Sequence, residues 1–169
     1  MKPIEGYNKL RGGYYTPKKI AEFIATWAIR TKNDEILEPS CGDGSFISAI
    51  ADRLHEMGAS DQSIKHNVTG VELDKVEASK ASQYGPNVVQ SDFFTYYQKC
   101  IDGEKEFDVI VGNPPFIRYQ NFEEEYRKVA FELMTKHGFQ PNRLMNIWLP
   151  FLVLACKALK PDGRVGMVI

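Results

Sequence analysis

The stretch EILEPSCGDGSFISAIADRLHEMG, residues 35–58, decides the fold. Its first part, residues 35–40, is short and mainly apolar and predicts a buried strand. A turn with glycines at positions 42 and 44 follows, and this turn opens a helix that runs to Gly58. A buried strand that passes through a glycine turn into a helix indicates an α/β protein.

A helix is also predicted before this stretch, over residues 16–29. It begins with Thr16 as its N-cap and Pro17 at its first position, a combination that is typical of helix starts. Apolar residues recur at helical spacing and form one face, which consists of Ile20, Phe23, Ile24 and Trp27.

The alternation of strands and helices continues toward the C-terminus. It predicts a mostly parallel, doubly wound sheet in which ligands bind beyond the carboxyl ends of the strands. The length of 169 residues suits a single domain. The predicted strands span residues 68–74, 88–94, 107–113 and 164–169, and the predicted helices span residues 121–138 and 146–163.

Composition narrows the classes of protein that remain. No apolar run reaches the roughly 18 residues of a membrane span, and the N-terminus lacks the apolar core of a secretory signal. The three cysteines and three histidines have no spacing typical of a metal site or a disulfide framework, so we expect a reducing cytoplasm. The net charge of −1 is not that of a basic nucleic-acid binder. Residues 1–33 nevertheless carry seven Lys/Arg and two Asp/Glu, and this basic segment is either a solvated tail or a contact for phosphate.

The loop after the first strand has the composition of a ligand site. Gly42 and Gly44 allow the backbone to approach a ligand at a helix N-terminus. The loop lacks the G-x-G-x-x-G and G-K-[ST] patterns of phosphate-binding loops, and it carries Glu38 and Asp43. These two carboxylates disfavour a pyrophosphate and favour a cationic ligand. An ordinary strand-to-helix turn is the alternative.

Acidic residues also follow the next two predicted strands. Glu72 is placed to accept from ribose hydroxyls, and Asp74 lies two residues further on. Asp92 can accept from an exocyclic amine, and Phe93 can lie against a base. Acids at three successive strand ends predict a pocket for an adenosine-containing cation, and S-adenosylmethionine fits this description.

The fourth strand ends in NPPF, residues 113–116. A planar amine is a poor nucleophile because its lone pair is delocalised. The side-chain carbonyl of Asn113 and the backbone carbonyl of Pro114 can accept its two N–H groups and free the lone pair toward a methyl group. Pro114 and Pro115 hold the backbone rigid, as preorganised electrostatics require, and Phe116 can stack on the ring that bears the amine. A Pro-Pro turn without chemistry is the alternative.

These motifs together resemble the S-adenosylmethionine-dependent N6-adenine DNA methyltransferases of restriction–modification systems. GGYYTPKKIAEFIA (12–25) resembles their N-terminal cofactor segment, EPSCGDGSF their cofactor loop, and NPPFIRYQ their catalytic motif. The resemblance implies a Rossmann-like class I methyltransferase sheet, truncated after the fifth strand, with residues 1–33 as a cofactor segment and residues 34–169 as the catalytic core. It implies catalytic roles for Asn113, Pro114, Pro115 and Phe116. It implies cofactor contacts from Tyr15, Thr16, Glu38, Cys41, Gly42, Gly44, Glu72, Leu73, Asp92 and Phe93, with Cys41 as a packing residue rather than a nucleophile.

The resemblance further implies a duplex DNA substrate with a flipped adenine. It places two more strands, a second aromatic and a target-recognition region beyond Ile169, so the last strand is expected to be an exposed edge that invites self-association. Two alternatives stay open. One is another planar nitrogen as acceptor, namely a glutamine amide, RNA guanine or cytosine N4, although the GGYYTP segment and the Asn of NPPF favour adenine. The other is a cofactor-binding fragment without turnover.

Overall fold

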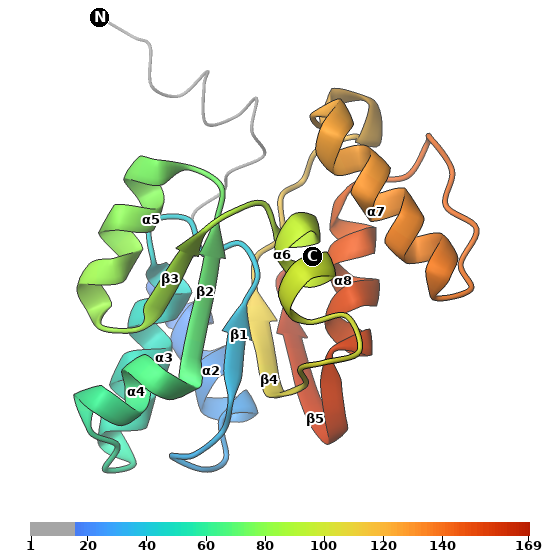
Figure 1. The fold of residues 1–169 in the computed structure, drawn as a ribbon. Helices are drawn as coiled ribbons and strands as arrows, with labels where there is room; N and C mark the ends of the chain where they lie inside the picture. Colours follow the sequence, from blue (N-terminus) through green and yellow to red (C-terminus); the bar gives the residue numbers. More distant parts are fainter. Residues whose placement is uncertain (1–15) are drawn as a thin grey trace, which may run out of the picture.

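The computed structural model describes residues 16–169, which form one five-stranded sheet with helices on both faces (Figure 1). All strand pairs are parallel and the strand order is β3-β2-β1-β4-β5. The predicted doubly wound α/β fold is therefore confirmed. The strands are β1 (Ile36–Glu38), β2 (Val68–Glu72), β3 (Asn87–Gln90), β4 (Phe107–Gly112) and β5 (Leu159–Met167).

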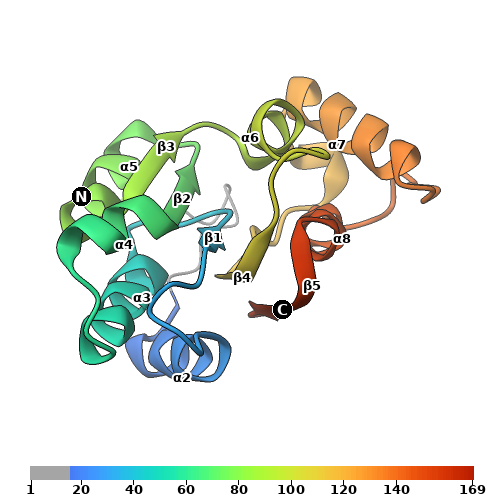
Figure 2. The ribbon, with the colours of Figure 1, turned by 60° about the horizontal axis from the view of Figure 1, so that its bottom comes forward.

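The helices divide between the two faces of the sheet (Figure 2). Alternate side chains of a strand point to opposite faces, so Ile36 of β1 packs with α2 and α3 while its neighbour Leu37 packs with α6, α7 and α8. The sheet is thus buried between two apolar layers. The helices are α2 (Lys18–Ala28), α3 (Ser45–Glu56), α4 (Asp61–Asn67), α5 (Lys75–Ala81), α6 (Phe93–Cys100), α7 (Glu124–Lys136) and α8 (Trp148–Lys157).

Helix α2 differs from its prediction at its start and in the face that it buries. Its N-cap is Pro17, whose carbonyl accepts from Ile20 N–H at 2.8 Å, and Thr16 is buried ahead of the helix. The prediction of Thr16 as N-cap was wrong. The buried face consists of Ala21, Ala25 and Ala28, whereas Ile20, Phe23 and Trp27 are exposed. Small side chains let α2 lie close to α3 and the sheet, and this close approach outweighs the greater apolarity of the other face.

Two further boundaries were wrong for local reasons. The strand predicted over residues 88–94 stops at Gln90, because the Asp92 carboxylate accepts from the N–H groups of Phe94 and Thr95, at 3.0 and 3.1 Å, and starts α6. The helix predicted over residues 146–163 ends at Lys157. The following residues begin β5 and form a bulge, since Phe107 pairs with Leu159 but Val109 pairs with Arg164.

Helices α4 and α5 were not predicted. Each is only seven residues long and begins with a side-chain cap. The Ser60 hydroxyl accepts from Ser63 N–H in α4, and the Asp74 carboxylate accepts from Val76 N–H in α5. Short helices of this kind carry too few periodic apolar positions to be recognised from the sequence.

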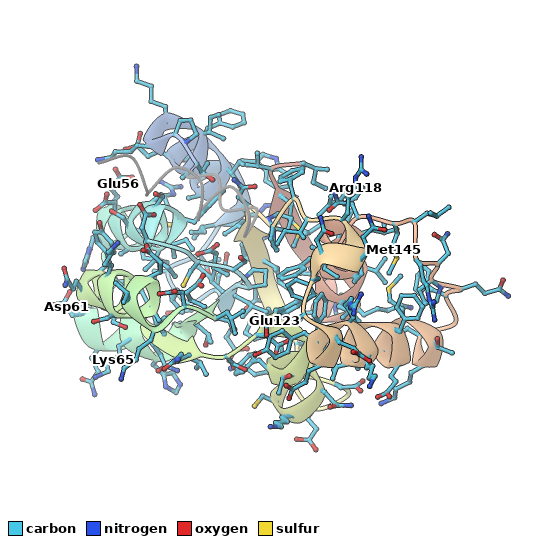
Figure 3. All side chains as sticks on the ribbon, turned by 90° about the horizontal axis from the view of Figure 1, so that it is seen from above. Glu56, Asp61, Lys65, Arg118, Glu123 and Met145 are labelled. Atoms are coloured by element: carbon cyan, nitrogen blue, oxygen red, sulfur yellow. The ribbon has the colours of Figure 1, made fainter. Side chains whose placement is uncertain are left out.

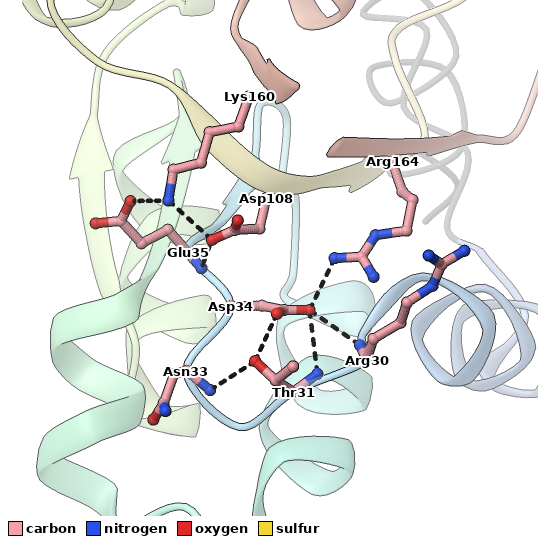
Figure 4. Close-up of polar contacts among 8 residues, drawn as sticks. All are labelled: Arg30, Thr31, Asn33, Asp34, Glu35, Asp108, Lys160 and Arg164. Atoms are coloured by element: carbon pink, nitrogen blue, oxygen red, sulfur yellow. Dashed lines mark hydrogen bonds and ion pairs between the residues drawn. The ribbon is translucent and has the colours of Figure 1, made fainter. Parts of the chain in front are cut away.

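A polar network holds the amino ends of β1, β4 and β5 together (Figure 4). The buried Asp34 accepts from Thr31 Oγ1 at 2.7 Å, from Arg30 N–H at 2.9 Å and from Arg164 Nη2 at 3.0 Å. Beside it, Lys160 Nζ bridges Glu35 at 2.8 Å and Asp108 at 3.0 Å. This network lies at the edge of the sheet opposite to the carboxyl ends of the strands.

No helix within residues 16–169 combines the length and apolarity needed to cross a membrane.

Candidate active site

A cavity of about 160 Å³ lies at the carboxyl ends of the strands. Cavities of this size have room for an aromatic ring. Its walls come from the loops after β1, β2, β3 and β4, from the start of α7 and from α8. Loops remote in the sequence therefore meet at the position predicted for the ligand. The lining residues are Pro39, Ser40, Val71, Glu72, Leu73, Asp74, Ser91, Asp92, Phe93, Pro115, Ile117, Asn121, Phe122, Glu123 and Phe151.

The loop after β1 reaches the site through a turn that requires glycine. Gly44 is the N-cap of α3 and has a φ of +94°. A Cβ atom at this position would lie 2.8 Å from the Cα of Ala81 and 2.9 Å from the Tyr84 ring. Cys41 N–H donates to the carbonyl of Val71 at 2.9 Å, which joins the loop to the end of β2. The loop is thus joined to β2 through its backbone, and at Gly44 it leaves no room for a side chain.

Glu72 is held rigidly at the end of β2. One carboxylate oxygen accepts from Gly42 N–H and the other accepts from Asp74 N–H, each at 2.8 Å. Burial raises the pKa of Glu72, and these two hydrogen bonds oppose the rise. The side chain lines the cavity, and each oxygen keeps acceptor capacity for a ligand hydroxyl.

Glu38, at the end of β1, is a buried carboxyl group. Its side chain is 1% exposed, and its Oε2 receives no hydrogen bond from residues 16–169. Burial raises the pKa of Glu38 well above its ordinary value, and the charges of Glu72 and Asp43 raise it further. A buried unpartnered acid is costly unless a donor or a cation arrives to satisfy it. Glu38 therefore fits a ligand that carries positive charge.

Asp92 and Phe93 form the wall of the cavity after β3. Asp92 is buried and caps α6. Its Oδ1 accepts from both Phe94 N–H and Thr95 N–H. Phe93 is buried and stacks on Phe151 of α8, with ring centroids 4.9 Å apart. This pair gives the cavity a flat apolar side.

The NPPF motif begins directly after β4, in the middle of the sheet. Its predecessor Gly112 accepts from Val168 N–H at 3.0 Å. A Cβ atom at Gly112 would lie 3.0 Å from Oε1 of Glu38, so the NPPF motif starts beside this carboxyl group. Pro114 is buried, and Asn113, Pro115 and Phe116 are half-buried. Pro115 also lines the cavity, so the NPPF motif and the loop after β1 are neighbours.

Five of the fourteen predicted site residues line the cavity, and Glu38, Asn113, Pro114 and Phe116 are not among its lining residues. Glu72, Leu73, Asp92, Phe93 and Pro115 line the cavity. Cys41, Gly42 and Gly44, in the loop after β1, do not line the cavity. Cys41 N–H and Gly42 N–H donate to Val71 and Glu72, which do line it. Thr16 is buried but does not line the cavity, and Tyr15 lies outside the described residues.

Cys41 is a packing residue, as expected. Its side chain is buried, and burial, followed by the charges of Glu38 and Glu72, raises the pKa of its thiol far above the ordinary value. The reactive thiolate is therefore disfavoured, and the thiol is suited to packing.

Several lining residues were missed from the sequence. Ile117, Asn121, Phe122 and Glu123 follow NPPF within ten residues, and Phe151 lies in a helix that was predicted only as buried. Apolar residues such as Phe122 and Phe151 look the same in a core and in a pocket wall. The available signal was the closeness of residues 117–123 to NPPF in the sequence.

Comparison with solved structures identifies the class of this fold. The chain matches a putative class I S-adenosylmethionine-dependent methyltransferase from Listeria monocytogenes with a TM-score of 0.67 and 17% identity, over 94% of this chain and 47% of that one. It also matches a chain of the DrdV–DNA complex with a TM-score of 0.71 and 20% identity, over 97% and 21% of the respective chains. The fold is that of class I methyltransferases.

The chain belongs to the N-6 DNA Methylase family, whose model matches residues 4–169. It is 33% identical to the type II methyltransferase M.HincII of Haemophilus influenzae, over 91% of this chain and 26% of that protein. It is 32% identical to the modification methylase CviBIII of Paramecium bursaria Chlorella virus NC1A, over 94% and 37% respectively. The chain thus spans between a quarter and two fifths of the length of these two relatives.

Proposed function

We propose that this chain is the cofactor-binding and catalytic core of an enzyme that transfers a methyl group from S-adenosylmethionine to the N6 amine of adenine in DNA. The observation that carries the proposal is the shared wall at Pro115. The NPPF motif begins beside Glu38 and also lines the cavity that contains Glu72 and Asp92. A methyl donor in the cavity and an amine at NPPF would therefore be neighbours.

The residues around the cavity fit S-adenosylmethionine. Glu72 would accept from the ribose hydroxyls, because it lines the cavity and its two oxygens are held by backbone N–H groups. Asp92 would accept from the exocyclic amine of the base, and Phe93 would contact the base. The unpartnered carboxyl of Glu38 suits the cationic methionine end, together with Thr16 and the loop of Gly42 and Gly44. When bound, the cofactor supplies an electrophilic methyl group.

The catalytic residues activate the acceptor without a strong base. Asn113 would accept one N–H of the target amine through its side-chain carbonyl, and the Pro114 carbonyl would accept the other. Two acceptors outside the plane of the amine favour a pyramidal nitrogen whose lone pair is available. Pro114 and Pro115 limit backbone motion, so the acceptors are preorganised. Phe116 would stack on the flipped base.

DNA is the proposed substrate on the strength of the family and of the relatives' names. The duplex must release the adenine from its stack, which costs a few kcal/mol. The net charge of −1 gives this chain little general attraction for phosphate. We therefore expect cofactor binding to be measurable on the isolated chain and methylation to be weak without the remainder of the protein.

Calorimetry with S-adenosylmethionine, on the chain and on Glu72→Ala, tests the cofactor site. We expect saturable binding that is at least tenfold weaker in the variant, because the charge-assisted contacts to the ribose are lost. Glu132→Ala is the matched control, since Glu132 is exposed on α7 and away from the cavity. The absence of binding by a folded wild-type chain would refute the proposal for this chain.

Methyl transfer to adenine-containing DNA, compared with a glutamine-bearing peptide and with cytosine-only DNA, tests the acceptor. Transfer to DNA adenine that is abolished by Asn113→Ala supports the proposed reaction. Transfer to the peptide or to cytosine instead would identify one of the other planar nitrogens as the substrate.

A further inference from the structure

Glu123 contributes an acid to the cavity that does not come from a strand end. It is the N-cap residue of α7, but its side chain accepts no N–H of that helix. No hydrogen bond or ion pair joins its carboxylate to another residue of the described chain 16–169. It nevertheless lines the cavity. Figure 3, which looks onto the carboxyl edge of the sheet, shows it at the start of α7 toward the centre of the molecule.

Glu123 and Asp92 line the same cavity, and a ring contact brings the residue before Glu123 against the helix that Asp92 caps. Its neighbour Phe122 packs edge-on against Phe94, with ring centroids 6.0 Å apart. Phe94 lies in the first turn of α6, which Asp92 caps. The pKa of Tyr126 is raised first by burial and then by the charges of Glu123, Asp92 and Glu125.

The position of Glu123 is held by packing on both sides. Phe122 contacts Phe94 and also Tyr126, whose ring centroid is 5.9 Å away. The preceding turn is closed by Asn121 N–H, which donates to the Arg118 carbonyl at 2.9 Å. These contacts fix the backbone at Glu123, while its exposed side chain stays available to a ligand in the cavity.

A bound adenine base requires two hydrogen-bond acceptors for its exocyclic amine. The exocyclic amine of adenine has two N–H groups. Asp92 has committed Oδ1 to two N–H groups of α6, which leaves Oδ2 to accept one donor of the base. The second N–H of the amine needs another acceptor. Glu72 already accepts from Gly42 N–H and Asp74 N–H, and Asp74 caps α5, so Glu123 is the acid of the cavity that accepts no hydrogen bond within residues 16–169.

We infer that Glu123 is a specificity-determining residue, which accepts the second N–H of the cofactor's exocyclic amine and with Asp92 selects a 6-amino purine over a 6-oxo purine. This inference rests on the proposed cofactor site and adds a residue to it. A 6-oxo purine presents an oxygen where the amine stood, and two carboxylates would then face an acceptor without a shared proton. The predicted selectivity is therefore electrostatic and comes from Asp92 and Glu123 together.

The test measures the affinities of S-adenosylhomocysteine and S-inosylhomocysteine by calorimetry on the same chain. We expect the wild type to prefer the adenosyl ligand at least tenfold, and Glu123→Ala to reduce this preference by about three- to tenfold, the value of one hydrogen bond. Glu123→Gln keeps a carbonyl acceptor and should lose less selectivity. Glu125→Ala, also exposed in the first turn of α7 but outside the cavity, should leave the preference unchanged.

The two ligands separate the failure of this inference from the failure of the proposed function. If the wild type binds both ligands and Glu123→Ala keeps the full preference, the role of Glu123 is refuted and the cofactor site stands. If the folded wild type binds neither ligand, the proposed function and this inference fall together. The inference requires Glu123→Ala to bind the adenosyl ligand more weakly and the inosyl ligand at least as tightly as the wild type does, because the carboxylate that faces the 6-oxo group is gone. Retained binding of the inosyl ligand also shows that the variant is folded.

Discussion

Glu38→Gln is expected to stabilise the folded chain at neutral pH while weakening the cofactor site. The side chain is 1% exposed, and its Oε2 receives no hydrogen bond within the described residues. Burial, Glu72 and Asp43 all raise its pKa. The ionised form of Glu38 therefore destabilises the wild-type fold. A neutral amide of similar shape removes the free-energy cost of burying this charge.

The sign and size follow from proton linkage. A carboxyl group whose folded pKa is raised binds more protons in the folded state than in the unfolded state, so stability falls as the pH rises from the unfolded pKa toward the folded pKa. Each pH unit of this window is worth about 1.4 kcal/mol, so between about pH 4.3 and pH 7 the loss cannot exceed roughly 3.7 kcal/mol. The buried amide needs partners of its own, which reduces the net gain to about 1–2 kcal/mol.

Thermal unfolding at pH 4 and pH 7.5 measures the effect. A gain of 1–2 kcal/mol corresponds to roughly 2–8 °C for a domain of this size, so Glu38→Gln should melt that much higher at pH 7.5 and show little or no gain at pH 4. Glu132→Gln, which changes an exposed carboxyl on α7, should shift neither melting temperature. An equal gain at both pH values, or a loss at pH 7.5, would refute the assignment of Glu38 as a strained ionisable group.

Three further predictions concern the stability and association of the fold. Asp34→Ala should lower the free energy of unfolding by about 3 kcal/mol, because it leaves the largely buried Arg164 without its carboxylate partner. The melting temperature should then fall by roughly 6–12 °C, and an unchanged melting temperature would mean that the network makes no net contribution to stability. Gly44→Ala should destabilise clearly more than Gly58→Ala in urea unfolding, since both residues have positive φ but only at Gly44 would the Cβ collide with other atoms. The edge strand β5, Leu159–Met167, should support self-association, and a monomer in sedimentation at tens of micromolar would count against it.

The sequence alone was sufficient for the class of fold and for the edge of the sheet at which the cavity lies. Parallel strands bring their carboxyl ends to one edge, so acids placed after successive strands had to converge. Glu72 and Asp92 do line one cavity with Pro115 of NPPF. The residues that the sequence pointed to are distinctive in type, because carboxylates, paired prolines and glycines are unusual after buried strands.

Local competition decided where the sequence interpretation was wrong. Asp92 was expected after a strand that continued into Phe93 and Phe94, but its carboxylate caps a helix that begins at Phe93. The aromatic face of α2 was expected to be buried, but the alanine face packs closer. In both cases the hydrophobic pattern allowed a second arrangement, and a cap or a close helix contact selected the one that forms.

The alternation of strands with the longer helices, and the types of residue that follow each strand, could be predicted from the sequence because both are local properties. The later residues that complete the cavity could not be predicted, because tertiary packing places them there. Phe122, Glu123 and Phe151 reach it because α7 and α8 pack on α6, through ring contacts between residues far apart in the chain. Such contacts depend on the shapes of several side chains at once, and no spacing within a single segment encodes them.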